Sequence, residues 1–148
     1  MTGPDKISIG NVEIRTKHVK SYTVEMKGDE KINSVMLKNG TKLTFKDQDA
    51  KGIKSVTGGK SSLNGKSYDM YNFMGIKGLT IEGSENNDAY MLFNCENYEV
   101  DTRGGGQDKI TLVDSTRGKV RADENDVIEN SSRNRNGLEG SIEDWQTK

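Results

Sequence analysis

The chain has 148 residues, of which 30% are hydrophobic, and its mean hydropathy is −0.85. This length is typical of one domain, and so low an apolar content argues against a wide helical core and favours a narrow β core. No apolar run approaches the ~18 residues of a membrane-spanning helix, so we expect no membrane span.

Charge is divided unevenly along the chain. Residues 1–75 carry 13 Lys and Arg against 8 Asp and Glu, whereas residues 76–148 carry 9 against 15. Two interpretations stay open, namely two differently solvated ends, or a dipolar molecule that meets an acidic partner or holds cations. Basic residues alternate with acids and lack interleaved aromatic residues, so we expect no nucleic-acid partner.

The first half is typical of β-hairpins. Alternating apolar residues predict strands at 7–14, 22–26 and 35–45. Gly10-Asn11 suits a type II′ turn, and Asn39-Gly40 and Asn64-Gly65 are further hairpin signals. The Gly/Ser/Lys-rich segment 52–60 is predicted to be a loop.

From Leu79 onward, a short pattern recurs in which two apolar residues flank one polar residue. Every second occurrence is marked by Tyr90, Ile110 and Ile128, which lie 20 and 18 residues apart. Such spacing is typical of short strands that stack on one another as the rungs of a repeat. The predicted strands in this half are 79–82, 89–93, 98–102, 109–113 and 119–128.

The sequence therefore predicts an all-β fold with almost no helix. We expect one domain over residues 1–130, hairpin-rich over 1–75 and repeat-like over 76–130, followed by a polar flexible tail, 131–148, in which Ile142 and Trp145 could form one docking turn. The preferred architecture is a β-solenoid-like C-terminal part that is preceded by antiparallel hairpins at the N-terminal end. An antiparallel β-sandwich or meander is the alternative.

Three aspartates occupy matched places, two residues before the apolar marker of a rung: Asp88, Asp108 and Asp126. Around the second, residues 103–111 read Arg-Gly-Gly-Gly-Gln-Asp-Lys-Ile-Thr and match a G-G-x-G-x-D-x-U-x nonapeptide except at its first glycine. Residues 83–129 thus resemble the repeat-in-toxin β-roll. The resemblance implies calcium at these three aspartates, whereas their alternative role is to form turns.

Other chemical signals are weaker. Gly104-Gly105-Gly106 lacks the Lys-Ser/Thr of a phosphate-binding loop, so we interpret it as a corner. The single histidine, His18, and the single cysteine, Cys95, lie 77 positions apart, and we expect no catalytic pair. The N-terminus has no apolar signal region, which predicts a protein that is cytoplasmic or exported without a signal peptide.

The functional prediction is a non-enzymatic binding or structural module. It would act through a displayed β surface on a protein or glycan partner, as a bacterial or phage surface, secreted-effector or particle component. The alternative is a small polysaccharide-active enzyme that uses carboxylates on one sheet face.

Overall fold

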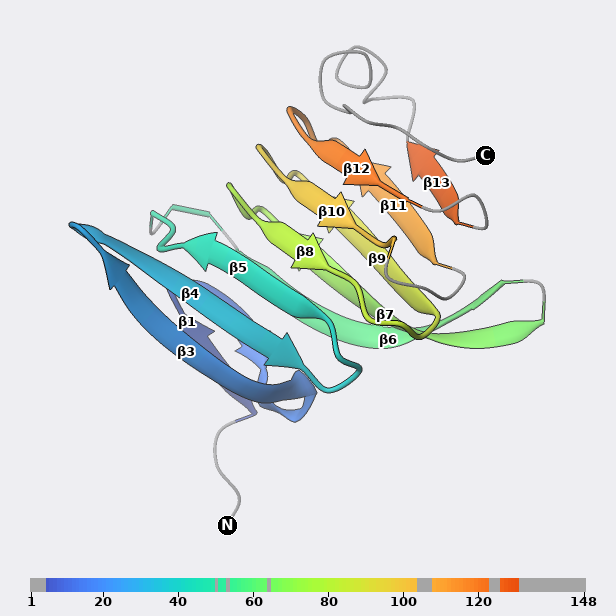
Figure 1. The fold of residues 1–148 in the computed structure, drawn as a ribbon, viewed down its shortest axis with the longest axis horizontal. Helices are drawn as coiled ribbons and strands as arrows, with labels where there is room; N and C mark the ends of the chain where they lie inside the picture. The colour runs from blue at the N-terminus through green and yellow to red at the C-terminus, as the bar shows by residue number, and fades with distance from the viewer. Residues whose placement is uncertain are drawn as a thin grey trace.

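The computed structural model describes residues 5–49, 51–52, 54–63, 65–103, 108–122 and 126–130. Within them the chain is all-β, apart from one turn of 3-10 helix, η1 (Thr16–His18), and it forms two mixed sheets that do not close into a barrel (Figure 1). Sheet A has the order β1 (Lys6–Ile9), β2 (Val12–Arg15), β6 (Ser55–Leu63), β7 (Lys66–Met74), β9 (Asp88–Phe93), β11 (Lys109–Val113) and β13 (Val127–Asn130). Sheet B has the order β12 (Lys119–Arg121), β10 (Glu99–Asp101), β8 (Thr80–Glu82), β5 (Lys42–Lys46), β4 (Glu30–Leu37) and β3 (Val19–Lys27).

The N-terminal strands are largely antiparallel hairpins. The pairs β1–β2, β3–β4, β4–β5 and β6–β7 are all antiparallel. The first turn differs from the prediction, because Gly10 and Asn11 both have positive φ values, of 56° and 66°. Two left-handed central residues define a type I′ turn, whose twist matches that of the flanking strands.

The prediction of a loop at residues 52–60 is wrong over most of its length, because β6 begins at Ser55. This strand pairs with β7 along all of its residues and with β2 at its start. Composition alone concealed it, since glycine and serine lack the side chains that mark a strand. Tertiary pairing supplies what the residues' own propensity does not.

The C-terminal strands alternate between the sheets and pair in parallel. In sheet A, Tyr90 lies opposite Ile110, which lies opposite Ile128. In sheet B, Ile81, Val100 and Val120 form the equivalent row. The predicted strand 119–128 is in fact two strands, β12 and β13, one in each sheet. Residues 131–148 lie outside the described residues.

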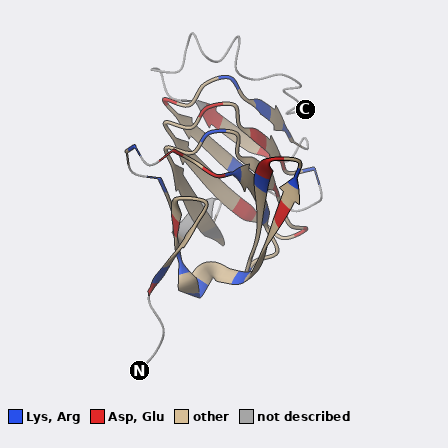
Figure 2. Ribbon diagram, turned by 90° about the vertical axis from the view of Figure 1, so that its left-hand side faces the viewer, with Lys and Arg blue, Asp and Glu red and all other residues tan. Residues whose placement is uncertain are grey.

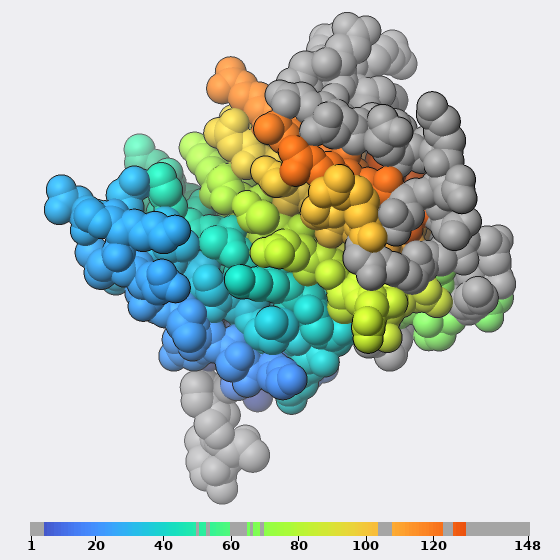
Figure 3. Space-filling model, viewed as in Figure 1, coloured from blue at the N-terminus to red at the C-terminus, as the bar shows by residue number. Residues whose placement is uncertain are grey.

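One apolar core joins the two sheets. It includes Val35, Leu43 and Val100 from sheet B and Phe73 and Ile110 from sheet A, all fully buried. The strands succeed one another in chain order from the N-terminal to the C-terminal end of the molecule (Figure 3). The all-β prediction is confirmed, and the arrangement fits the sandwich alternative, with mixed rather than purely antiparallel sheets.

The corners that follow sheet A strands repeat every 19 or 20 residues. Left-handed backbone occurs at Gly75, Asn94 and Asp114, and again three residues later at the positions of another glycine, asparagine and arginine: Gly78, Asn97 and Arg117. Glycine and asparagine adopt this conformation more readily than other residues. The corner shape therefore depends on the position in the repeat rather than on one residue type.

Candidate functional site

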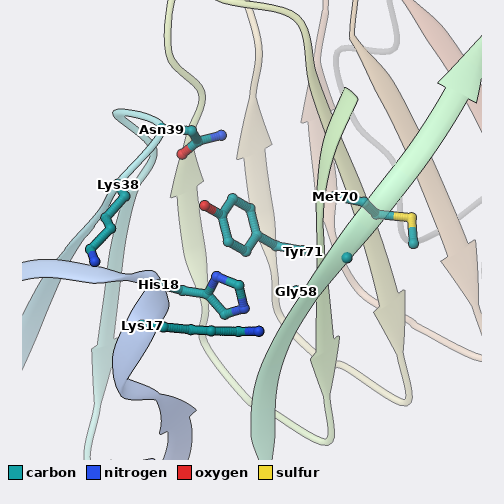
Figure 4. Close-up of a pocket in the computed structure, with 8 residues that line it drawn as sticks. Lys17, His18, Lys38, Asn39, Gly58, Met70 and Tyr71 are labelled. Carbon is teal, nitrogen blue, oxygen red and sulfur yellow. The ribbon is translucent and has the colours of Figure 1, made fainter. Parts of the chain in front are cut away.

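A pocket of about 450 Å³ opens at the seam between the N-terminal hairpins and sheet A (Figure 4). Its walls come from segments that are distant in sequence: η1, the β4–β5 turn, β6 and β7. It is lined by Lys17, His18, Lys38, Asn39, Gly58, Gly59, Met70 and Tyr71. A concave site that gathers a few polar groups on an apolar floor is the usual form of a small-ligand site.

His18 forms one wall of this pocket, and the backbone holds it there. The Lys38 N–H donates to the His18 carbonyl oxygen at 3.0 Å, which ties η1 to the β4–β5 turn. The imidazole meets the Tyr71 ring edge to face, with 5.5 Å between ring centroids. A Cβ atom on Gly58 would lie 2.5 Å from two atoms of the imidazole, so His18 needs glycine at that position.

Two lysines give the pocket a positive charge. Lys17 and Lys38 are exposed at its rim. Within the described residues, no carboxylate lies within ion-pair distance of either lysine, whereas Lys6, Lys31 and Lys46 each have an acidic partner. In the view of Figure 2, basic and acidic residues lie interspersed along the strands. The seam pocket is thus a local site of uncompensated positive charge.

Asn39 connects the pocket to the C-terminal half. Its Oδ1 accepts a hydrogen bond from the Thr41 N–H at 2.9 Å, and its Nδ2 donates to Asp88 Oδ1 at 2.8 Å. The first bond is an Asx turn that shapes the β4–β5 loop. The second joins this loop to the first of the three matched aspartates.

Asp88, Asp108 and Asp126 form a ladder on the inner side of sheet A. The Asp88 N–H donates to Asp108 Oδ1, and the Asp108 N–H donates to Asp126 Oδ1, both at 2.9 Å. Thr102 Oγ1 donates to Asp126 Oδ2 at 2.8 Å, and the Ser84 N–H and hydroxyl donate to Asp88. The sequence correctly placed the three aspartates at equivalent positions. They fix the register between successive sheet A strands.

Burial makes this ladder electrostatically costly. Asp88 and Asp108 are fully buried, and Asp126 is nearly so. Desolvation raises the pKa of Asp108 to about 8, with a further contribution from the neighbouring carboxylates. Desolvation also raises the pKa of Asp88, although its hydrogen bonds oppose that shift. Within the part of the chain that the structure describes, Asp108 Oδ2 has no hydrogen-bond partner, which favours a protonated carboxyl at this rung.

The ladder aspartates are also the predicted calcium ligands. The ladder carboxylates accept backbone N–H groups, and the described residues contain no group of three or more His, Cys, Asp or Glu side chains arranged to hold a metal ion. Calcium takes 6–8 oxygen ligands, and the turns that would supply carbonyl oxygens, 104–107 and 123–125, lie outside the described residues. Calcium at these aspartates stays a prediction.

Cys95 is a core residue in this structure. It is fully buried, and its thiol contacts the carbonyl oxygens of Phe73 and Phe93 at 3.6 and 3.5 Å. Burial raises the pKa of the thiol to about 11, so it is not the thiolate that nucleophilic chemistry needs. His18 is not among the polar partners of Cys95.

Sequence reasoning did not identify the seam pocket. Lys17, Lys38 and Tyr71 carry no motif, and Gly58 lay within a segment that was predicted to be a loop. No local signal could have joined them, because they meet only when β6 and β7 are placed beside η1 and the β4–β5 turn.

No family model, curated protein sequence or solved structure matches this chain. Within the described residues, no helix has the length and apolar character needed to cross a membrane.

Proposed function

We propose that this protein is a non-enzymatic binding module whose seam pocket takes an anionic glycan. The observation that carries the proposal is the pairing of two uncompensated lysines, Lys17 and Lys38, with a floor of glycine and tyrosine. Lysine ammonium groups attract carboxylate or sulfate groups. Gly58 and Gly59 have no side chains, so the floor that they form with the buried Tyr71 leaves room for a sugar ring.

The pocket has the size and character for a short saccharide rather than for a folded partner. Its volume of about 450 Å³ falls within the 300–1,000 Å³ range that is usual for small-molecule sites. Asn39, His18 and the two lysines supply donors around its rim, which would orient the acidic group and hydroxyl groups of a uronic-acid or sulfated sugar.

Titration calorimetry with acidic and neutral oligosaccharides of equal length tests this function. We expect oligogalacturonate or a sulfated oligosaccharide to bind and a neutral glucan not to bind. Lys17→Ala and Lys38→Ala should each weaken binding about tenfold, because one charge-assisted hydrogen bond contributes about 1.5 kcal/mol. Binding should also weaken as the salt concentration rises.

Two matched controls locate the site. Lys27→Ala removes an exposed lysine outside the pocket and should leave affinity unchanged. Gly58→Ala should displace His18 and reduce affinity. A Cβ on the adjacent Gly59 would meet no described atom within 4 Å, so Gly59→Ala should leave His18 in place. Equal binding of acidic and neutral sugars, or binding that survives the double lysine variant, would contradict the proposal.

Incubation of the protein with the same oligosaccharides separates binding from turnover. The alternative enzyme would need carboxylates that a polysaccharide can reach, but Asp88, Asp108 and Asp126 face the interior. We therefore expect intact oligosaccharide after incubation with the protein. Product that is lost in Asp108→Asn or Asp126→Asn would favour the enzyme instead.

We also propose an architecture for the half of the molecule beyond the pocket: the described strands of residues 76–130 are successive coils of a β-solenoid. Parallel pairing of alternate strands and the 19- or 20-residue spacing of the left-handed corners support it. Inserting a second copy of residues 94–113 after Val113 should add one coil and give a folded, longer protein by circular dichroism and small-angle scattering. Insertion of only ten of these residues should disrupt the fold, because the next strand would fall in the wrong sheet.

A further inference from the structure

β3 is the longest strand at a sheet edge in the part of the chain that the structure describes. It forms one edge of sheet B and has nine residues, whereas the other three edge strands, β1, β12 and β13, have four, three and four. Short edge strands are a common protection against pairing with a second molecule. β3 lacks this protection, and it follows the margin of the molecule at the N-terminal end (Figure 1).

The side chains of β3 that face the core side of sheet B are apolar and remain exposed. Tyr22, Val24 and Met26 alternate along the strand and are between 47% and 62% exposed. Tyr22 lies opposite the buried Val35 of β4. Val24 lies opposite Asn33, which is also buried. Directly opposite residues share a face of the sheet, so among the described residues the apolar core is open at this end.

A groove of about 310 Å³ adjoins this apolar row. Its lining includes Tyr22 and Val24 from β3, and Ile9, Gly10 and Asn11 from β1 and the β1–β2 turn. The side chains of an added strand would therefore have space on the core side of sheet B.

We propose that two copies of this chain pair through β3, antiparallel and with Val24 opposite Val24 of the second copy. Tyr22 then lies opposite Met26 of the second copy, so every residue of the apolar row meets an apolar residue. The six strands of sheet B in each copy become one continuous sheet. Such a contact is isologous, so it occupies both β3 edges and ends at a dimer.

Charge and polarity favour this register over its neighbours. On the outer face, the charged side chains of Glu25 and Lys27 lie opposite hydroxyl side chains of the second copy. A slip of two residues in one direction would place Met26 opposite Lys20, and a slip in the other direction would place Glu25 opposite Glu25. Only the proposed register pairs all three apolar residues with one another. This self-complementarity identifies a second copy as the partner of β3.

The size of the contact predicts a weak dimer. Residues 21–27 pair regularly with β4, after a bulge at the start of β3, and they form the contact. One strand edge is a small interface beside the roughly 800 Å² that each partner buries in a standard complex. We therefore expect a reversible dimer that is populated at about 100 μM protein and is dissociated at about 1 μM.

Sedimentation equilibrium at these two concentrations measures the association. Val24→Lys should raise the dissociation constant by at least about tenfold, because two ammonium groups would then lie opposite each other at the centre of the contact. Val24→Glu should do the same through two carboxylates. Val24 is half exposed, and circular dichroism verifies that each variant folds.

A mixture of the two variants tests the register itself. Equimolar Val24→Lys and Val24→Glu should form a heterodimer, because side chains of opposite charge then meet where position 24 lies opposite itself. Met74→Lys is the control, since it changes an exposed methionine on sheet A, and it should leave the dimer unchanged. A monomeric unmodified protein at about 100 μM would overturn the proposal. A dimer that survives Val24→Lys, or a mixture that stays monomeric, would also overturn it.

Discussion

The two halves of this molecule set the register of their strands by different means. In the N-terminal half, hairpin turns such as Gly10-Asn11 join strands that are neighbours in sequence, so each register is local. In the C-terminal half, paired strands are about 20 residues apart and the intervening chain visits the other sheet. Register there is set by side chains that repeat from strand to strand.

This difference accompanies a difference in buried carboxylates, which among the described residues occur only in the C-terminal half. The C-terminal half contains the Asp88–Asp108–Asp126 ladder and a second contact, in which Ser115 Oγ accepts the Cys95 N–H at 3.1 Å. Parallel strands without a tight turn could slip by two residues and keep their apolar face inward. A buried carboxylate that must meet one particular N–H makes such a slip costly. We infer that the ladder provides specificity at the expense of electrostatic stability.

The largest predicted effect is a pH dependence that comes from the C-terminal half. The pKa of Asp108 is about 8 in the folded protein and near 3.8 when unfolded. The folded state therefore holds this proton more strongly, and the resulting stability is complete below pH ~4 and is lost as the pH rises towards 8. Its size is on the order of a few kcal/mol. Urea unfolding between pH 5 and 8 measures it.

Asp108→Asn should flatten that dependence, because asparagine retains an oxygen acceptor for the Asp88 N–H and cannot ionise. Asp101 is a control of opposite sign. The Arg103 hydrogen bond lowers its pKa, so its contribution to stability is present above pH ~4 and is lost in more acidic solution. An unmodified protein whose stability does not fall from pH 5 to pH 8 would show that Asp108 is not buried as described.

Calcium provides the next test of the C-terminal half. If it binds only the folded protein at the predicted aspartates, a hundredfold excess over Kd adds about 2.7 kcal/mol, and the melting temperature rises by several degrees. Asp108→Asn should remove most of this gain. Asp29→Asn, in the β3–β4 turn, should retain it. Melting that is indifferent to calcium and to chelator removes the metal hypothesis.

A smaller effect tests how tightly successive corners pack. A Cβ atom on Gly118 would lie 2.1 Å from atoms of the Tyr98 ring, which is buried against it. Gly118→Ala should therefore destabilise the protein by about 1–3 kcal/mol, through overpacking. For Gly59→Ala, in the N-terminal half, the added Cβ would meet no atom of the described residues within 4 Å, and the substitution should cost much less. In a double-mutant cycle, Tyr98→Leu should restore part of the stability that Gly118→Ala loses. Additive changes in the free energy of unfolding would show that the two residues are not in contact.

Much of the fold could be predicted because its signals are local. Alternation of apolar residues gave β9 and β11 nearly to the residue, and Asn39-Gly40 marked a real turn. Segment 55–63 was missed because its glycines and serines pair only in the presence of β2 and β7. The predicted strand 119–128 was divided in the structure, since a local pattern does not reveal that its two ends belong to different sheets.

The sequence by itself determined the β class, the equivalence of Asp88, Asp108 and Asp126, and the spacing of the repeat, because each follows from residue periodicity. Only the tertiary structure decided that the aspartates face inward and accept backbone N–H groups, and that strand pairing in this half is parallel. It alone brought Lys17, Lys38 and Tyr71 to one pocket. These features depend on contacts between segments that are distant along the chain. The residues that make such contacts do not follow a periodic pattern in the sequence.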